Sequence, residues 1–413
     1  MDRVIYHCDL NGFYASVECL YNPQIREKPV AVCGSTEERH GIVLAKNEIA
    51  KKFGIKTGEA IWQARQKCRD IVIVPPHMDR YIRFSNMARE IYEQYTDQVE
   101  AFGIDECWLD MTGCVSLFGD PATVADEIRK KIRDELGITV SVGVSWNKIF
   151  SKFASDLKKP DAVTLVGRED YKEKVWPLPS KDLLYVGHST YRKLMKYGIL
   201  TIGGIAKVEP ELLRQLLGKW GEVLWIFANG LDNVPVAKVG VESIIKSIGN
   251  SMTTPRDMVN DDDINKALFA LAESICARLR KHGFKGRTVQ ISVKDTNLGY
   301  KEFQHPLPSP SYITPELAGS AIELFKRHWT WPNPVRAIGV RATNLVAADS
   351  VFQLNLLLDE GHRQKLELLE RSVDRIRRRF GQQSIQRAIV LEDALTGNQN
   401  PLFNVIHPVS YWK

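Results

Sequence analysis

Short β-prone runs alternate with helical repeats between Val4 and Val144, and this order limits the fold more than any other feature of the sequence. The run Val4 to Cys8 ends in Asp9, which predicts a buried strand with a carboxylate at its carboxyl end. Apolar residues three and four positions apart predict an amphipathic helix over Arg80 to Tyr95. The other predicted elements are a helix from Gly12 to Tyr21, β segments at Glu100 to Ile104 and Cys107 to Leu109, a helix from Ala122 to Leu136 and a strand from Thr139 to Val144. Together they predict a β-α-β-β-α-β core.

Further segments surround this core, and the whole chain is expected to be an α+β protein. Residues 19–77 predict a small inserted lobe, with an apolar run at Val30 to Cys33 and two helical repeats after it. After Pro177 the sequence is typical of helices separated by turns, up to about Gly230, and residues 231–241 contain Pro and Gly and predict a linker. A separate module covers residues 242–346. Its predicted elements are β-like stretches at Ser243 to Ile248, Thr288 to Val293 and Val335 to Ala342 and helices at Ile264 to His282 and Pro315 to Trp329.

Composition restricts the class of protein. The chain has 413 residues, of which 44% are hydrophobic and 26% charged, as in ordinary globular proteins. The 56 Lys and Arg residues exceed the 50 acidic residues only slightly, so a basic surface for an anionic partner requires segregation of charge. Seven cysteines without a C-x-x-C pair argue against a zinc site. Because no signal peptide or long apolar run occurs, we expect a cytoplasmic protein without membrane segments.

Three acidic residues are candidates for a metal site. Asp9 at a strand end and the pair Asp105 and Glu106 at a predicted hairpin would converge on one edge of the sheet. Mg²⁺ prefers oxygen ligands, and two or three carboxylates suffice for a two-metal phosphoryl-transfer site with ions about 3.5–4 Å apart. An Asp-Glu pair at a turn is more often solvated surface, so the surrounding motifs must decide. Asp110, further along the same β segment, is expected to be structural.

The motif Cys8 to Glu18 (CDLNGFYASVE) resembles the opening motif of the Y-family translesion polymerases, which include bacterial DNA polymerases IV and V. Other blocks follow in the order of the family: Ala45 to Asn47 with Ala50 to Gly54, Gly103 to Glu106, Ser141 to Val144 with Asn147 and Lys148, Lys152 to Leu157 with Lys159 and Pro160, Lys246 to Gly249, and Val335 to Arg341. The resemblance covers about residues 3 to 345. It implies a right-hand polymerase with a palm (1–18 and 78–166), small fingers (19–77), a helical thumb with a helix-hairpin-helix (167–230), a linker (231–241), a little finger (242–346) and a C-terminal tail (347–413).

The resemblance also implies an activity. A monomeric, template-directed DNA polymerase would extend a primer on primer-template DNA from deoxynucleoside triphosphates, with low fidelity, in DNA repair and damage tolerance. Asp9, Asp105 and Glu106 would hold two Mg²⁺ ions, for which Mn²⁺ can substitute, and the backbone carbonyl of Leu10 would complete one shell. One ion would lower the pKa of the primer 3′-hydroxyl, and the other would accompany pyrophosphate.

Further residues would bind the nucleotide. Tyr14 matches the steric gate of the family, an aromatic ring that leaves no room for a 2′-hydroxyl; outside this motif it would be an ordinary core tyrosine. Phe13 and Ala45 belong to the same nucleotide-binding motifs. Lys51 and Lys159 match positions that contact the triphosphate, where an ammonium group acts as a point charge on phosphate. Without the resemblance, each would be a solvated lysine.

The sequence departs from the family pattern at three places. Asn11 stands where many polymerase IV-like members carry Asp, which looks more like the polymerase V branch. Glu48 stands where many members place a Tyr on the triphosphate, and Lys51 replaces their Arg, which bears on nucleotide affinity. Tyr185 replaces the first Gly of the helix-hairpin-helix, whereas Gly187 remains to let backbone amides approach a phosphate.

DNA contacts and a partner protein are implied for the C-terminal part. Arg336 and Arg341 match strand positions that face template phosphates. A wider basic set is consistent with tracking a duplex, or with a solvated face; it comprises Arg278, Arg280, Lys281, Lys285, Arg287, Lys294, Lys301 and Arg341. The segment Gln353, Leu354, Asn355, Leu356 and Leu357 resembles the pentapeptide that binds the bacterial sliding clamp, with Leu357 in place of Phe. A basic helix predicted over 363–380 either contacts DNA or is solvated.

Two other functions compete with the polymerase. A non-catalytic DNA-binding or clamp-recruited repair factor could use the same fold, but the intact Asp9, Asp105 and Glu106 argue against it. A nucleotide cyclase also uses a two-metal palm. The helix-hairpin-helix and the basic module, which a small substrate does not need, argue against a cyclase. Primer extension separates these three functions.

Overall fold

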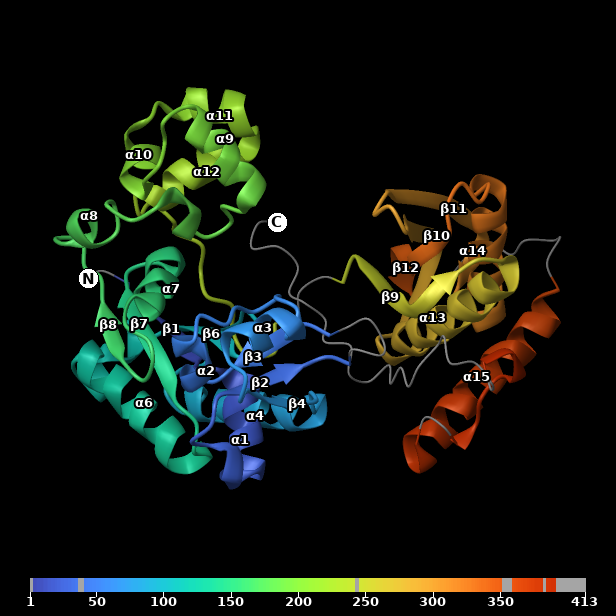
Figure 1. Ribbon diagram of the computed structural model, residues 1–413, viewed down its shortest axis with the longest axis horizontal. Coiled ribbons are helices and arrows are strands. Elements are labelled where there is room, and N and C mark those ends of the chain that lie inside the picture. The colour runs from blue at the N-terminus through green and yellow to red at the C-terminus, as the bar shows by residue number, and fades with distance from the viewer. Residues whose placement is uncertain (1–2, 36–40, 242–244, 351–358, 382–383, 391–413) are drawn as a thin grey trace. The chain divides into compact units, whose positions relative to one another are not determined.

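The computed structural model describes residues 3–35, 41–241, 245–350, 359–381 and 384–390. The chain divides into two compact units (Figure 1), one made mainly of residues up to 242 and the other mainly of the residues after it. Among the described residues, no helix is long and apolar enough to cross a membrane.

A five-stranded sheet with the order β5-β6-β1-β7-β8 lies at the centre of the first unit. Its strands are β1 (Ile5–Leu10), β5 (Val99–Ala101), β6 (Glu106–Asp110), β7 (Val140–Ser145) and β8 (Val163–Leu165). The helices α4 (Met78–Tyr92) and α6 (Pro121–Leu136) pack against the apolar face formed by Tyr6, Cys8 and Leu10. These elements confirm the predicted β-α-β-β-α-β core. Strand β8 was not predicted, because a three-residue run carries too little periodicity.

The opposite face of this sheet is covered by α7 (Lys148–Leu157), which contacts β1 and β7 (Figure 1). The close approach depends on Gly143, because a Cβ there would lie 1.9 Å from the backbone oxygen of Ser151. Asn147 begins the helix by accepting a hydrogen bond from the backbone N–H of Phe150 at 2.8 Å. Successive strand residues point to opposite faces, so Ile5, His7 and Asp9 of β1 face α7.

Residues 231–241, for which the sequence predicts a linker, form neither a helix nor a strand. The backbone N–H of Ala237 donates to the carboxylate of Glu100 at 2.7 Å. Val236 is buried with Ile5 and Trp108 of the five-stranded sheet. The segment therefore packs against the five-stranded sheet through both a hydrogen bond and an apolar contact.

The inserted lobe contains a three-stranded sheet with the order β3-β2-β4. Its elements are β2 (Val30–Cys33), β3 (Val43–Lys46), α2 (Glu48–Lys52), α3 (Ile61–Lys67) and β4 (Val72–Val74), and α1 (Phe13–Tyr21) precedes it. The helical part that follows comprises α8 (Tyr171–Lys174), α9 (His188–Lys196), α10 (Ile202–Lys207), α11 (Pro210–Leu217) and α12 (Lys219–Ala228). Its core is apolar and includes Leu194, Leu213 and Phe227.

The second unit is an α+β module with a four-stranded sheet of order β11-β10-β12-β9. Its elements are β9 (Ser247–Met258), α13 (Asp261–Lys281), β10 (Phe284–Asp295), β11 (Tyr300–Ser311), α14 (Thr314–His328) and β12 (Val335–Ala347). Strand β11 was not predicted because Pro306, Pro308 and Pro310 argue against a strand. Proline is tolerated there because β11 is at the edge of the sheet, where fewer ladder hydrogen bonds need a backbone N–H.

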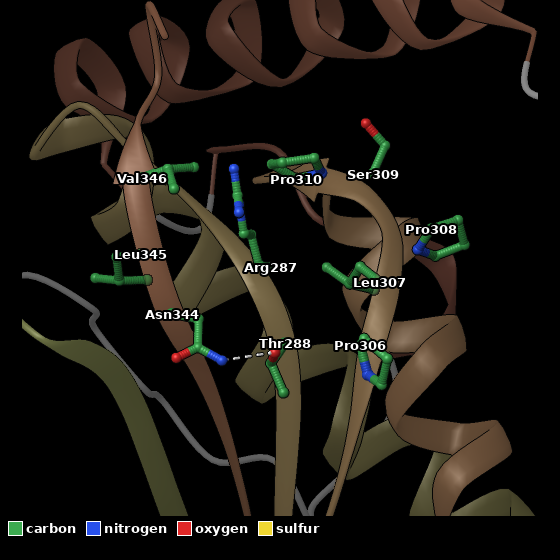
Figure 2. A pocket seen from close by; sticks show the side chains of 10 residues that line it. All are labelled: Arg287, Thr288, Pro306, Leu307, Pro308, Ser309, Pro310, Asn344, Leu345 and Val346. Carbon is green, nitrogen blue, oxygen red and sulfur yellow. Dashed lines mark hydrogen bonds between the residues drawn. The ribbon is translucent and has the colours of Figure 1, made fainter. Parts of the chain in front are cut away.

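The proline-rich end of β11 departs from regular pairing with β10. Gly286 pairs with Ser311 but Thr288 already pairs with Pro306, so the intervening residues of β11 bulge outward. The bulge opens a pocket of about 660 Å³ between β10, β11 and β12. Figure 2 shows Asn344 of β12 donating to the hydroxyl of Thr288 at 3.1 Å within it. None of the described residues that line this pocket is acidic.

The helix α15 (Glu360–Phe380) corresponds to the predicted basic helix. Part of its charge is used internally: Arg363 pairs with Glu316 at 2.7 Å and Arg377 pairs with Glu273 at 2.9 Å. Both arginines are buried. For these two residues neither expectation, a DNA contact or a solvated face, is correct, because each guanidinium docks the helix on its own unit.

Candidate active site

Strand pairing brings the predicted acidic residues together. In the antiparallel register of β1 and β6, Asp9 is directly opposite Glu106. Asp105 immediately precedes β6, and its carbonyl accepts a hydrogen bond from the N–H of Leu10 at 3.1 Å. Asp9 and Glu106 are cross-strand partners and therefore point to the same face of the sheet, the one covered by α7. We call Asp9, Asp105 and Glu106 the acidic cluster.

The acidic cluster carries a high density of negative charge in a poorly solvated place. Burial raises the pKa of Asp9 to about 7, and the charge of Glu106 adds to this increase while Lys159 opposes it. Burial and the charge of Glu106 also raise the pKa of Asp105. Burial opposes ionisation of Glu106 as well, but the contact with His7 and the charge of Lys152 hold its pKa well below the ordinary value. Nearby cations would therefore stabilise the ionised carboxylates of the cluster.

Two lysines supply part of this positive charge. Lys159 Nζ is 2.7 Å from Asp9 Oδ2, and Lys152 Nζ is 2.6 Å from Glu106 Oε2. Burial would lower the pKa of Lys159, but the charges of Asp9 and Asp156 outweigh it and hold that pKa above the ordinary value. A separation of 2.7 Å is typical of a charge-assisted hydrogen bond. Lys159 and Asp9 are therefore an ion pair, even though burial alone favours a neutral Asp9.

The side chains of the acidic cluster supply the atoms that could bind a metal ion. Among the residues that the structure describes, no three His, Cys, Asp or Glu side chains gather into a ready metal-binding group. Asp9 and Glu106 each turn an oxygen toward a lysine instead. The donor chemistry nevertheless fits a hard divalent cation, because carboxylate oxygens are its preferred ligands and the charge of Glu106 destabilises both neighbouring carboxylates. Binding would require the lysine ammonium groups to move aside.

Tyr14 lies beside the acidic cluster. Burial raises its pKa, and the charge of Asp105 contributes, so the phenol is within electrostatic reach of that carboxylate. Its ring stacks on Tyr81 of α4 with centroids 4.1 Å apart and planes 9° from parallel. The neighbouring Phe13 is only 3% exposed and belongs to the core. A contact of Phe13 with a nucleotide would therefore have to use its backbone.

The other predicted nucleotide contacts are on the inserted lobe. Ala45 is half-buried on β3. Lys51 on α2 is half exposed and pairs with Glu48 at 3.4 Å. Two of the residues that depart from the family pattern are thus partners of each other, and the pair is weak because both side chains are solvated.

Asn11, the first departure, has a structural explanation. Its amide nitrogen donates to the hydroxyl of Ser141 at 2.9 Å. Its amide oxygen accepts from the backbone N–H of Asp161 at 2.8 Å and from the hydroxyl of Thr139 at 3.1 Å. An Asp could not donate to Ser141 in this way, so the amide joins β7 to the turn that carries Lys159.

Sequence reasoning missed His7 and assigned no role to Lys152. His7 is fully buried, with Nδ1 2.9 Å from the hydroxyl of Ser155 and Nε2 3.3 Å from Glu106 Oε2, the latter outside hydrogen-bond geometry. The hydroxyl of Ser155 also donates to the carbonyl of Lys152 at 2.7 Å. Burial lowers the pKa of His7 to about 4. The period-2 alternation of β1, which places His7 on the face of Asp9, was the signal that could have identified it.

The predicted DNA contacts have different surroundings. Gly187 caps the start of α9, and a Cβ there would meet nothing within 4 Å, so its backbone is accessible. Tyr185, which replaces a Gly, has φ 70° and so takes a left-handed conformation that Gly adopts more easily. On β12, Arg341 is exposed and Arg336 is half-buried.

The wider basic set does not act as one free surface. Arg280 is buried and pairs with Glu370 at 3.2 Å and with Asp374 at 2.6 Å. Lys285 pairs with Glu367 at 2.7 Å. For these two residues the expected role in tracking a duplex is wrong, because acidic residues of α15 neutralise them. No periodicity in the sequence predicts these ion pairs. The clamp-like residues Gln353, Leu354, Leu356 and Leu357 lie outside the described residues.

Comparisons with known proteins agree on one family. The family model described as impB/mucB/samB family matches residues 8–156, and the model of its C-terminal domain matches residues 245–356. The chain is 55% identical to DNA polymerase IV of Acetivibrio thermocellus, over 95% of this chain and 98% of that protein. It is 39% identical to DNA polymerase IV of Moorella thermoacetica, over 95% and 97% of the two chains.

Structure comparison gives the same answer. A solved Y-family DNA polymerase chimera superposes with a TM-score of 0.74 and 25% sequence identity, covering 83% of this chain and 99% of that one. The relatives named here are polymerases IV, whereas Asn11 alone had suggested the polymerase V branch. From its sequence motifs, its fold and these relatives, the chain belongs to the impB/mucB/samB family, the Y-family of translesion DNA polymerases.

Proposed function

We propose that the acidic cluster is the polymerase centre of this enzyme, with Asp9, Asp105 and Glu106 and the carbonyl of Leu10 holding two Mg²⁺ ions or, in their place, Mn²⁺. The observation that carries the proposal is the strand register that sets Asp9 opposite Glu106, with Asp105 adjacent. When bound, such ions neutralise charge that develops on the α-phosphate and lower the pKa of the primer 3′-hydroxyl. A non-catalytic repair factor is not favoured, because it would have no use for three neighbouring carboxylates at one edge of the sheet.

The neighbouring side chains of the protein position the substrates. A triphosphate competes with Asp9 for Lys159, since both are anions that attract the same ammonium group. Lys152 pairs with Glu106 and limits the net charge of the cluster until a metal ion takes its place. Tyr14 lies against the sugar and excludes a 2′-hydroxyl, Phe13 and Ala45 border the nucleotide, and Lys51 attracts the triphosphate from the fingers.

We assign the parts of the hand as follows: palm 1–18 and 78–166, fingers 19–77, thumb 167–230, linker 231–241, little finger 242–346 and tail 347–413. The backbone at Gly187 binds a phosphate of the duplex, as its open surroundings permit. Arg336 and Arg341 contact phosphates of the template. Phosphate contacts carry no sequence code, which suits an enzyme that must copy any template.

Primer extension is the direct test. A labelled primer is expected to be extended in the presence of Mg²⁺ on an undamaged template and across a lesion, because both outcomes belong to translesion synthesis. A reaction with excess chelator provides the control and should show no extension. Extension that is equally efficient with chelator would contradict a metal-dependent centre, and no extension of either template would contradict the assigned activity.

We also propose that the tail recruits the sliding clamp through Gln353, Leu354, Leu356 and Leu357. The support is the likeness of this segment to the clamp-binding pentapeptide. Deleting residues 353–357 should leave synthesis on a bare primer unchanged and weaken clamp affinity by about tenfold or more, because buried apolar anchors dominate such interfaces. Affinity can be measured with purified clamp. Equal affinity before and after the deletion would reject the motif.

A further inference from the structure

A buried carboxylate lies behind the predicted steric gate. Glu18 of α1 has only 5% of its side chain exposed. It accepts hydrogen bonds from Tyr81 Oη at 2.7 Å and from Arg80 Nη1 at 2.9 Å, and His77 Nδ1 is 3.0 Å away. All three partners belong to the start of α4. We call these four residues the Glu18 cluster.

The Glu18 cluster touches the gate through one ring. Tyr81 is fully buried, and its ring is stacked flat on that of Tyr14, with centroids 4.1 Å apart. Phe13 packs at an angle against both rings, with centroids 5.7 Å from Tyr14 and 6.2 Å from Tyr81. One face of the Tyr14 ring is therefore backed by an aromatic ring that has no solvent to move into.

The helical spacing closes the arrangement. Tyr14 and Glu18 are four residues apart on α1, so their side chains leave the helix on the same side. Tyr81 lies between them, with its ring on Tyr14 and its hydroxyl on Glu18. The carboxylate of Glu18 also pairs with Arg80 at 2.9 Å, and a hydrogen bond to such a charged group is stronger than one between neutral groups. Sliding Tyr81 away from Tyr14 would break this bond.

We infer that Glu18 and Tyr81 are positioning residues that set the sugar selectivity of the polymerase by holding the Tyr14 ring in place. This inference rests on the proposed role of Tyr14. A clash rejects a ribonucleotide only as far as the clashing ring cannot yield, because a ring that moves aside makes room for the 2′-hydroxyl. The stacked Tyr81 blocks that movement, and the bond to Glu18 blocks the movement of Tyr81.

A merely structural role for the same residues has a different signature. If Tyr81 and Glu18 only stabilise the packing of α1 on α4, their loss lowers the melting temperature and slows incorporation of both sugars equally. If they position the gate, the ratio of the two incorporation efficiencies changes. The ratio of kcat/KM for a deoxynucleotide to that for the ribonucleotide of the same base separates the two roles.

The test uses Tyr81→Phe, which keeps the stacked ring and removes only the hydroxyl. We expect the ratio to fall by about 3- to 10-fold, as for the loss of one hydrogen bond to a charged group. In Glu18→Gln the ratio should fall less, since the amide oxygen of the glutamine can still accept a hydrogen bond from Tyr81. Tyr95→Phe is the matched control, because it also removes a tyrosine hydroxyl that donates to a carboxylate. The hydroxyl of Tyr95 donates to Glu127 at 2.9 Å, and neither residue contacts Tyr14, so the ratio for this variant should equal that of the wild type.

A double variant shows whether the effect passes through the gate. Tyr14→Ala with Tyr81→Phe should have the same ratio as Tyr14→Ala alone, because a positioning residue has nothing left to position. If Tyr14→Ala itself leaves the ratio unchanged, the proposed gate is wrong and the inference falls with it. If Tyr14→Ala lowers the ratio but a folded Tyr81→Phe does not, only the role of the Glu18 cluster is refuted.

Discussion

Asp105→Asn and Glu106→Gln are each expected to reduce primer extension by about a thousandfold or more while DNA binding stays near the wild-type level. In the proposed centre the carboxylates hold the metal ions and do not contact the duplex, so their loss would remove transition-state stabilisation without removing phosphate contacts. Asp105→Asn is the cleaner variant. Its carboxylate is destabilised by burial and by Glu106, so its neutralisation should not lower the melting temperature. Glu106→Gln also leaves Lys152 without its anion.

Asp110→Asn provides the matched control. Asp110 is buried on the same strand as Glu106, but it pairs with Arg3 at 3.2 Å and accepts from the N–H of Thr112 at 3.0 Å. Its neutralisation should cost stability and keep extension. Near-normal extension by Asp105→Asn or Glu106→Gln would refute the acidic cluster as the polymerase centre. The measurements are single-nucleotide extension rates, DNA affinity and melting temperature for each variant.

Tyr14→Ala is expected to lower the preference for deoxynucleotides over ribonucleotides on the order of 10- to 100-fold, the range in which a pocket discriminates one small group by size. The clash with the 2′-hydroxyl disappears with the ring, so incorporation of ribonucleotides should rise. Incorporation of the deoxynucleotide should change less, because it never met the clash. The measurement is the ratio of incorporation efficiencies for the two sugars with the same base.

Tyr14→Phe is the control for that experiment, since it keeps the excluded volume and removes only the phenol hydroxyl. Its ratio should stay near that of the wild type. A core tyrosine behaves differently: truncating it leaves a cavity, lowers the melting temperature and reduces both activities together. An unchanged ratio in a folded Tyr14→Ala protein would return Tyr14 to the core and leave sugar selection unexplained.

Much of the first unit, which contains the acidic cluster, was predictable from local sequence patterns. The run Val4 to Cys8 and its terminal Asp9 are a strand because alternating or continuous apolar residues can be read without knowing their partners. The helical repeat after Arg80 is of the same kind. The order of these elements predicts the β-α-β-β-α-β core, and that topology brings Asp9 and Glu106 to neighbouring strands. The motif around Tyr14 carried the resemblance that suggested a gate.

Other features depend on partners far away in the sequence. Lys159, which pairs with Asp9, is 150 positions away from it in the sequence. Asp374, which pairs with Arg280, is 94 positions away from it. The edge strand β11 is compatible with its prolines only because one side of it lacks a neighbour. The docking of residues 231–241 depends on Glu100 and Trp108.

The sequence by itself therefore determined the strands and helices of the predicted core and the acidic residues at their ends, because those properties arise from periodicity within a few residues. Only the tertiary structure decided which charges are used internally and which remain for substrates. Lys152, Lys159 and Arg280 are all basic residues in the sequence. Whether such a charge meets a carboxylate of its own chain or a phosphate depends on burial and on contacts between elements, which local pattern does not encode.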